Sequence, residues 1–184
     1  MRIIGGEYRR RLLDFPDVDG LRPTPDRVRE TLFNWLGQTL YGKHCLDLFA
    51  GSGALGFEAA SRGAERVVMV EKHRGVCQAL QNNIAKLGCT NVTLHCADGL
   101  EFARRERGRY DLIFLDPPFA AGYLPQVLSQ LPERLAPGGL VYVESGELFD
   151  PGAGWEVVRR ARAGAVHYQL LNYGNQEVQQ GAAQ

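Results

Sequence analysis

The chain has 184 residues, of which 45% are hydrophobic and 23% charged, and its 21 basic and 21 acidic side chains cancel. This length favours one domain with a sizeable core, while the composition excludes a disordered chain and gives no sign of a nucleic-acid partner from bulk charge. Glu7 and three arginines stand where a secretory leader would be apolar, and no run of about 18 apolar residues occurs, so we expect a cytoplasmic protein without a membrane segment.

The N-terminal residues 1–20 are predicted to form a small hairpin extension that turns at the "GG" pair or just after Arg10. A helix is predicted next, in the stretch "RPTPDRVRETLFNWLGQTL". Thr24 can cap this helix, with Pro25 at the first helical position, where the missing N–H costs nothing.

Short apolar runs then alternate with helical patterns, which indicates βαβ units and a doubly wound parallel sheet with helices on both faces. The strands are predicted at 44–50, 66–71, 92–97, 110–116 and 139–144, and the helices at 54–63, 74–88, 99–106 and 124–139. Two more strand-like runs, 155–162 and 165–173, follow with little helical material between them, as an antiparallel pair at one sheet edge. We assign 21–176 to this Rossmann-like α/β domain, with seven strands of which the last is antiparallel, and 177–184 to a flexible tail.

The four cysteines lie in strand-like or helix-like patterns and form no C-x-x-C pair. They are Cys45, Cys77, Cys89 and Cys96. We expect buried free thiols, without a disulfide and without a bound metal.

A glycine-rich stretch, "DLFAGSGALG", follows the first predicted strand and opens a helix. Its Gly51, Gly53 and Gly56 let the backbone turn tightly and approach a ligand where a Cβ would collide. Glu71 ends the second strand, where a carboxylate can accept both hydroxyls of a ribose. These features indicate an adenosine-containing ligand, although glycines can also serve only to pack a tight turn.

The ribose acceptor alone does not separate NAD from S-adenosylmethionine. The methyl donor is favoured because no room is left for a separate substrate domain and because the antiparallel edge pair suits a methyltransferase sheet. Asp47, which opens the glycine stretch, is placed to reach the methionine ammonium through the loop or a water. Asp98 can accept a hydrogen bond from the adenine amine or cap the helix after it, and the two roles are compatible.

The stretch "YDLIFLDPPF" ends the fourth strand with an acid, two prolines and an aromatic residue. In a doubly wound sheet, this strand end lies near the switch point where substrates bind. The Asp116 carboxylate and the Pro117 carbonyl can accept hydrogen bonds from an exocyclic base amine, while Pro117 and Pro118 fix the backbone. Phe119 offers a ring on which an extruded base can stack. The alternative is a simple strand-ending turn with a surface Phe.

The motif "DPPF" resembles the [DNS]-P-P-[FYW] motif of amino-methyltransferases. Together, "RPTPDRVRETLFNWL", "DLFAGSGALGFEAASRGA", "VEKH" and "YDLIFLDPPF" resemble the RsmD family of 16S ribosomal RNA guanine-N2 methyltransferases, over nearly the whole chain. The resemblance implies S-adenosylmethionine as the donor and an assembled or assembling 30S particle as the substrate. It also places Arg22, Pro23 and Thr24 near the methionine end and the target pocket, where Arg22 could also meet RNA phosphate.

The full prediction for the cofactor site is Thr24, Asp47, Phe49, Gly51, Ser52, Gly53, Glu71, Lys72, Asp98, Gly99 and Asp116. Three arginine runs, at 9–11, 104–109 and 159–162, could be solvated faces or RNA contacts. We expect Arg9, Arg10, Arg11 and Arg22 to contact RNA, and the protein to act as a monomer.

Three rival functions stay open from the residues alone, one of them an NAD-dependent reductase, which would bind NAD rather than S-adenosylmethionine. An adenine-N6 DNA methyltransferase shares the Asp-Pro-Pro-aromatic chemistry but would usually carry a target-recognition region that this chain lacks. A non-catalytic RNA-binding assembly factor could keep the pocket as a structural relic, against which the intact motifs argue.

Overall fold

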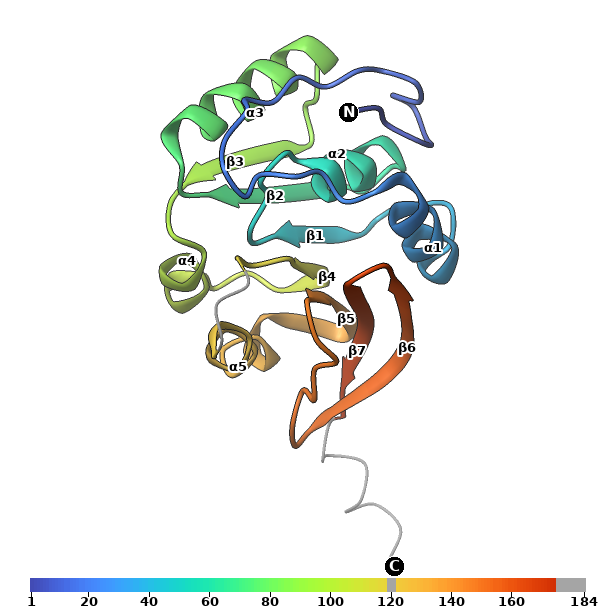
Figure 1. Cartoon of the computed structure of the whole chain (residues 1–184), viewed down its shortest axis with the longest axis vertical. Helices are drawn as coiled ribbons and strands as arrows, with labels where there is room; N and C mark the ends of the chain where they lie inside the picture. Colours follow the sequence, from blue (N-terminus) through green and yellow to red (C-terminus); the bar gives the residue numbers. More distant parts are fainter. Residues whose placement is uncertain (119–121, 175–184) are drawn as a thin grey trace, which may run out of the picture.

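The computed structural model describes residues 1–118 and 122–174; Phe119 and the predicted tail lie outside the described residues. Seven strands form one sheet, in the order β3-β2-β1-β4-β5-β7-β6 (Figure 1). They are β1 (His44–Asp47), β2 (Arg66–Glu71), β3 (Val92–Cys96), β4 (Tyr110–Leu115), β5 (Leu135–Ser145), β6 (Trp155–Ala163) and β7 (Val166–Tyr173). The strands from β1 to β5 pair in parallel, and β7 pairs antiparallel with both β5 and β6, which confirms the predicted topology.

Helices cover both faces of the sheet and divide the core into two apolar clusters. One cluster takes side chains from α1 (Asp26–Leu36), α2 (Ala54–Ser61) and α3 (Arg74–Leu87), and the other from α4 (Gly99–Arg105) and α5 (Tyr123–Leu128). Strands β1, β2 and β4 are buried almost throughout, which explains their continuous apolar sequences. None of the helices within the described ranges is long and apolar enough to cross a membrane.

Helix α3 follows its sequence pattern closely. Val76, Leu80, Ile84 and Leu87 are all buried, at the spacing of one helix face. The helix ends at Gly88, whose φ of +69° is the left-handed conformation that glycine adopts without strain. Local propensity and packing therefore agree over this whole element.

Three local predictions were wrong. The helix expected at 124–139 is only α5 and a 3-10 turn (Pro132–Arg134), because β5 begins at Leu135 and takes the rest of the stretch into the sheet. Thr24 does not cap α1: Pro25 is the N-cap, and no side chain caps the helix. Cys96 is exposed, since β3 is an edge strand, whereas the other three cysteines are buried.

The N-terminal residues 1–13 fold back on themselves as an antiparallel hairpin, with a β-bridge between Arg2 and Leu12 and further backbone hydrogen bonds between its two arms. Both predicted turning points are used: Gly6 and Arg10 have φ angles of +77° and +70°. A Cβ at position 6 would collide with the Ser61 carbonyl oxygen, so this close approach requires glycine. The hairpin is thus seated against the end of α2.

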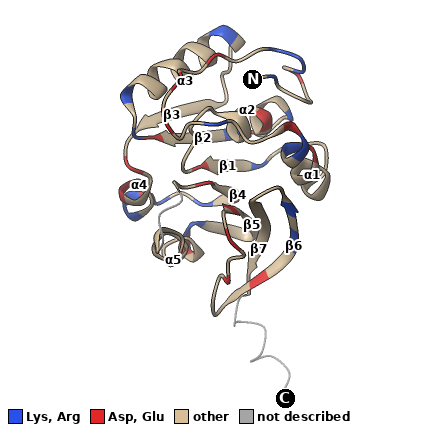
Figure 2. Cartoon of the chain, in the orientation of Figure 1, with Lys and Arg blue, Asp and Glu red and all other residues tan. Residues whose placement is uncertain are grey.

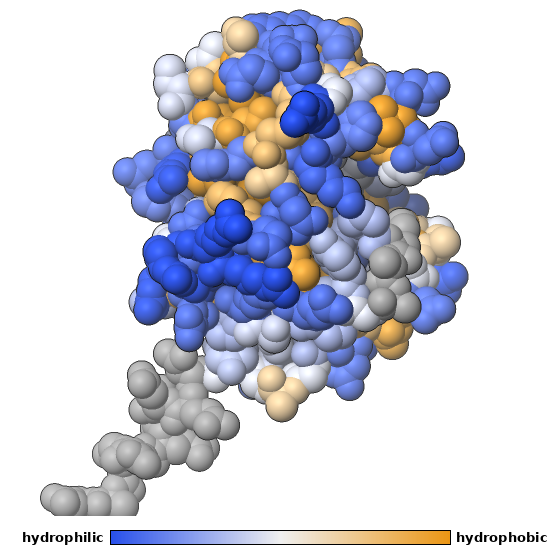
Figure 3. All heavy atoms as spheres, turned by 90° about the vertical axis from the view of Figure 1, so that its left-hand side faces the viewer, coloured by the Kyte–Doolittle hydropathy of each residue, from blue (hydrophilic) through white to orange (hydrophobic). Residues whose placement is uncertain are grey.

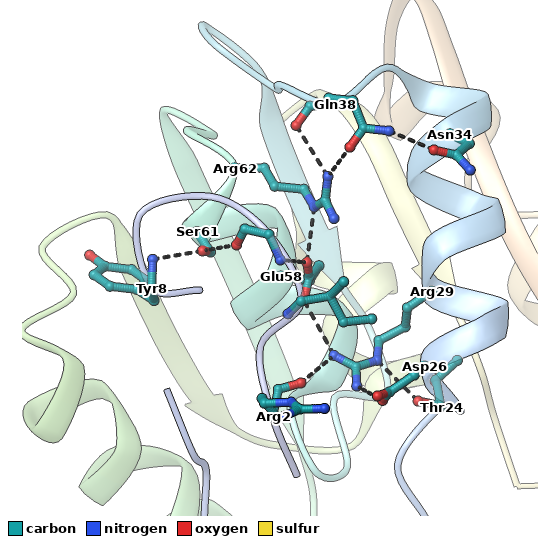
Figure 4. A network of polar contacts seen from close by, with 12 residues as sticks. Arg2, Tyr8, Thr24, Asp26, Arg29, Asn34, Gln38, Glu58, Ser61 and Arg62 are labelled. Carbon is teal, nitrogen blue, oxygen red and sulfur yellow. Dashed lines mark hydrogen bonds and ion pairs between the residues drawn. The ribbon is translucent and has the colours of Figure 1, made fainter. Parts of the chain in front are cut away.

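A buried carboxylate, Glu58 of α2, fastens the hairpin and α1 to the core (Figure 4). It accepts hydrogen bonds from the backbone N–H groups of Ile4 and Gly5, at 3.0 and 2.8 Å. It also pairs with the guanidinium groups of Arg29, at 3.2 Å, and Arg62, at 2.9 Å. Arg29 in turn donates to the carbonyls of Thr24 and Arg2. One charge therefore joins three segments that are distant in sequence.

We predict that Glu58→Ala lowers the free energy of unfolding by about 3–5 kcal/mol, because it leaves the buried guanidinium of Arg62 without its counter-charge and that of Arg29 with Asp26 alone. Urea titration followed by circular dichroism measures the change. The control is Glu65→Ala, since the Glu65 side chain makes an exposed contact with His44 and its removal should change the free energy of unfolding by no more than about 0.5 kcal/mol. Equal losses in the two variants would contradict the role of Glu58.

Candidate active site

Acidic side chains stand at the carboxyl ends of four neighbouring strands. Asp47 ends β1 and Glu71 ends β2, while Asp116 follows β4 and Glu144 lies near the end of β5. The parallel strands point to the left in Figure 1, where acidic residues gather in Figure 2. Figure 3 faces this edge and shows an apolar area bordered by strongly hydrophilic residues. The topology thus brings three predicted site residues, Asp47, Glu71 and Asp116, to one edge together with Glu144.

Glu71 holds the glycine loop in place. One carboxylate oxygen accepts the Gly51 N–H at 3.0 Å, and the other accepts the His73 N–H at 2.8 Å. Gly53 has a φ of +82°, and a Cβ there would lie 2.5 Å from the Phe57 ring. Each carboxylate oxygen still has a second lone pair. Glu71 can therefore shape the loop and accept hydrogen bonds from a ligand at the same time.

Asp47 is buried beneath the loop, with only 2% of its surface exposed. Its Oδ2 accepts the Gly56 N–H of α2 at 3.0 Å, so the side chain anchors the start of this helix. Burial raises its pKa to about 7. The hydrogen bond from Gly56 lowers this pKa, whereas the charges of Glu71 and Glu144 raise it. An oxygen of Asp47 is left for the contact predicted with a ligand ammonium.

Asp116 and Glu144 form a second group at this edge. Leu115 and Val143 are register partners, so Asp116 and Glu144 extend side by side from adjacent strands. Burial and the charge of Glu144 raise the pKa of Asp116. The Tyr142 hydroxyl donates to Glu144 Oε1 at 2.8 Å. Thr24, which fails to cap α1, is buried, and its side chain lies near Glu144.

The other predicted cofactor residues surround the glycine loop in different ways. Asp98 caps α4 by accepting the Glu101 N–H at 3.1 Å, which confirms one of its two predicted roles. Gly99 is buried, and a Cβ there would lie 2.6 Å from the Phe49 ring. Ser52 is buried and Lys72 is exposed. Phe49 therefore sits between the loop and the start of α4, where it can line a ligand site.

The structure separates the two groups of predicted RNA-binding arginines. Arg22 is exposed two residues before the buried Thr24, and its neighbour Leu21 packs beside Gly51 of the glycine loop. Arg9, Arg10 and Arg11 are exposed on the hairpin, where Arg11 donates to the Lys86 carbonyl at the end of α3. Since α3 runs back along the sheet, the hairpin lies toward the opposite edge (Figure 1). Within the catalytic loop, Pro117 is buried and Pro118 exposed, and Phe119 is not among the described residues.

Sequence reasoning missed Glu144 and its donor Tyr142. The signal was present, because "GLVYVE" ends its strand with an acid as "RVVMVE" does. Only the pairing of β4 with β5 places that acid beside Asp116.

The chemistry of these groups fits a cationic ligand. Over the described part of the chain, the charges that act on Asp47 and Asp116 are all acidic. Buried like charges without a counter-ion are unfavourable, so a positively charged ligand would be bound in preference to a neutral one. S-adenosylmethionine carries a sulfonium and an ammonium group, which satisfy this condition. No three His, Cys, Asp or Glu side chains among residues 1–118 and 122–174 are arranged to hold a metal ion.

Comparison with known proteins identifies the family. The family model "Conserved hypothetical protein 95" matches residues 1–172. The chain belongs to this family. "Ribosomal RNA small subunit methyltransferase D" of Escherichia coli K12 is 43% identical over 175 residues, covering 92% of this chain and 88% of that protein. The protein of the same name from Haemophilus influenzae is 40% identical over 179 residues, covering 92% of each chain.

The solved structure of yhhF from Escherichia coli superposes with a TM-score of 0.86 at 42% identity, covering 96% of this chain and 99% of that one. These matches confirm the predicted membership of the RsmD family and the methyltransferase fold. The family match spans the hairpin, the glycine loop and the Asp-Pro-Pro-Phe motif together.

We predict that the free protein loses stability as the pH rises from about 4 to about 7. Asp47 has a raised pKa of about 7 when folded against an ordinary value of 3.8, so the folded state binds the proton more tightly over that interval. The loss should amount to a few kcal/mol. Asp47→Asn keeps an acceptor for the Gly56 N–H and should reduce the dependence of the free energy of unfolding on pH. Urea unfolding at pH 5 and pH 7.5 measures this, with the exposed Glu133→Gln as control; identical slopes in wild type and Asp47→Asn would be contrary to the assignment.

Proposed function

We propose that this chain transfers a methyl group from S-adenosylmethionine to the exocyclic N2 amine of a guanine in 16S rRNA. The observation that carries the proposal is the position of Asp116 and Pro117, at the end of β4 beside the loop held by Glu71. An amine at this strand end would lie next to the ligand bound by the loop. The names of the relatives from Escherichia coli and Haemophilus influenzae, both small-subunit rRNA methyltransferases, support the same substrate.

The residues around the loop are assigned to the donor. Glu71 would accept the ribose hydroxyls, Asp98 the adenine amine, and Asp47 the methionine ammonium. Phe49 would pack against the adenine, because its ring already lies beside Gly99 at the start of α4. When bound, S-adenosylmethionine supplies a methyl group on a positively charged sulfur. The buried acids at the edge would hold that charge at the point where the loop, β1 and β4 meet.

The catalytic loop is assigned to the target amine. Exocyclic amines are weak nucleophiles because their lone pair is delocalised into the ring, so the enzyme must aim the nitrogen and favour its pyramidal form. Asp116 and the Pro117 carbonyl would each accept one N–H, and Phe119 would stack on the base. A strong base is unnecessary, since the nitrogen becomes acidic only once it has taken the methyl group.

The RNA is assigned to exposed basic residues. Arg22 lies close to the target pocket and would meet the phosphate of the target nucleotide or its neighbour. The hairpin arginines Arg9, Arg10 and Arg11 would hold a more distant part of the RNA or of the 30S particle. We propose that the protein does this as a monomer in the cytoplasm.

The experiment that tests the function is transfer of labelled methyl from S-adenosylmethionine to unmethylated 30S particles, naked 16S rRNA and duplex DNA. The labelled nucleoside is identified after digestion. Label in N2-methylguanosine is the expected result. Label in N6-methyladenine from DNA would keep the fold and chemistry but replace the substrate, and no label in any sample would favour a non-catalytic assembly factor.

We predict that Asp116→Ala lowers turnover about 100-fold or more and lowers S-adenosylmethionine affinity far less, because the main role of the residue is to hold the amine. Rates on 30S particles and calorimetric titration measure the two quantities. Asp111→Asn is the matched control on the same strand, since Asp111 bonds only the His44 N–H among the described groups. Normal turnover in Asp116→Ala would remove Asp116 from the mechanism.

We predict that replacing Arg9, Arg10 and Arg11 together with Ala weakens RNA binding and flattens its salt dependence. For each phosphate that the variant no longer neutralises, the slope of log K against log salt should fall by about 0.7 to 0.9. Filter binding to 16S rRNA at several salt concentrations measures the slope. The comparison is a variant with Arg159, Arg160 and Arg162 changed to Ala, which removes the same charge from β6. If the hairpin variant keeps the wild-type slope, the hairpin is excluded as an RNA contact.

A further inference from the structure

The pairing of β4 with β5 sets Glu144 directly beside the catalytic loop. Leu115 and Val143 are register partners, so the residues that follow them, Asp116 and Glu144, extend from adjacent strands at the same level. Glu144 is only 4% exposed. A buried carboxyl group thus stands behind the side chain that is proposed to hold the target amine.

The contact between the two carboxyl groups requires a proton. Ionised carboxylates only accept hydrogen bonds, so Asp116 and Glu144 can bond each other only if one of them is protonated. Glu144 already accepts a hydrogen bond from the Tyr142 hydroxyl at 2.8 Å, and this contact favours its ionised form. The proton therefore resides on Asp116, which donates it to Glu144.

The surrounding charges agree with this assignment. Burial raises the pKa of Asp116 well above its ordinary value, and the acids Glu144 and Asp47 raise it further. Burial also raises the pKa of Glu144, but hydrogen bonds from Tyr142, Thr24 and Asp116 oppose the shift. Arg29, the basic side chain that bonds the Thr24 carbonyl, is committed to Glu58, Asp26 and backbone carbonyls. Protons therefore neutralise part of the acidic edge in the free protein.

We propose that Glu144 is a positioning residue for Asp116: the two carboxyl groups share one proton, and this contact fixes which Asp116 oxygen faces the target amine. The proposal rests on the proposed function for its kinetic part. The protonated oxygen of Asp116 points to Glu144, and the other oxygen is left as an acceptor for the amine N–H. Glu144 thereby restricts the orientation of the Asp116 side chain, as the two prolines restrict the backbone that follows it.

Titration of the free protein tests the shared proton without any assay of activity. Carboxyl ¹³C shifts of labelled Asp and Glu side chains are followed with pH, and Asp116→Asn identifies the Asp116 signal by its loss. We expect Asp116 to titrate well above its ordinary pKa in the wild type and at a lower pH in Glu144→Gln, which keeps the volume but removes the negative partner. Asp116 titrating at the same pH in both proteins would overturn the proposal.

Kinetics tests the positioning. Glu144→Leu removes the contact at similar volume and should lower turnover on 30S particles about 10- to 100-fold, with S-adenosylmethionine affinity within about 3-fold. Glu144→Gln can still bond Asp116 through its amide and should keep more turnover than Glu144→Leu. Tyr168→Phe, a buried neighbour in the same cluster as Tyr142, controls for general disturbance of the core and should stay near wild type. Equal turnover in wild type and Glu144→Leu would overturn the positioning role.

Three outcomes distinguish a failure of the variant, of the proposed function and of the proposal about Glu144. If Glu144→Leu does not fold, as judged by its melting curve, the ¹³C titration of Glu144→Gln still decides whether the proton is shared. If the wild type transfers no methyl group to RNA, the proposed function fails, while the titration still judges the carboxyl pair. If the wild type is active and the Glu144 variants match it in turnover and in the titration of Asp116, the proposal about Glu144 fails and the proposed function stands.

Discussion

The buried carboxylate of Glu58 is the constraint on which the rest of the site depends. It sits in α2, an eight-residue helix that is buried along its whole length and begins directly after the glycine loop. Glu58 bonds the hairpin backbone, Arg29 of α1 and Arg62, and so fixes their positions relative to this helix. Arg29 also donates to the carbonyl of Thr24, whose buried side chain lies near Glu144. The two ion pairs gain little net stability, because burying charge is costly, but removing one partner would leave the others uncompensated.

The acidic edge has the opposite character, because its charges have no basic partner among the described residues. Burial and the charges of neighbouring acids raise the pKa values of both Asp47 and Asp116, and protons relieve part of the repulsion in the free protein. Such an edge is unfavourable for folding and favourable for binding a cation, since a bound positive charge can replace the protons. The molecule therefore uses paired charges where it needs a fixed frame and unpaired charges where it needs a ligand.

The sequence was most informative where structure is encoded locally. Strand β2, helix α3 with its terminal Gly88, and the glycine loop all lie where the patterns predicted them, since each depends on neighbouring residues. The misses depend on contacts between distant segments. Thr24 has the right chemistry for a cap, but its buried side chain lies near Glu144 of β5, a residue distant in sequence. Residues 135–139 read as helix, yet pairing with β4 draws them into β5.

Helix α2 also explains how RNA contacts far from the chemistry could matter to it. The hairpin is bonded to Glu58 and Ser61, in the second half of this helix, whereas the glycine loop and Asp47 meet its first residues. Eight residues of helix span about 12 Å, and a fully buried helix cannot shift without disturbing both apolar and ionic contacts. Any phosphate held by the hairpin would therefore lie at a fixed distance from the target pocket. Phosphate contacts do not read the base sequence, but they set the register of a bound RNA on the protein surface. With a rigid spacing of this kind, that register would decide which nucleotide lies at Asp116.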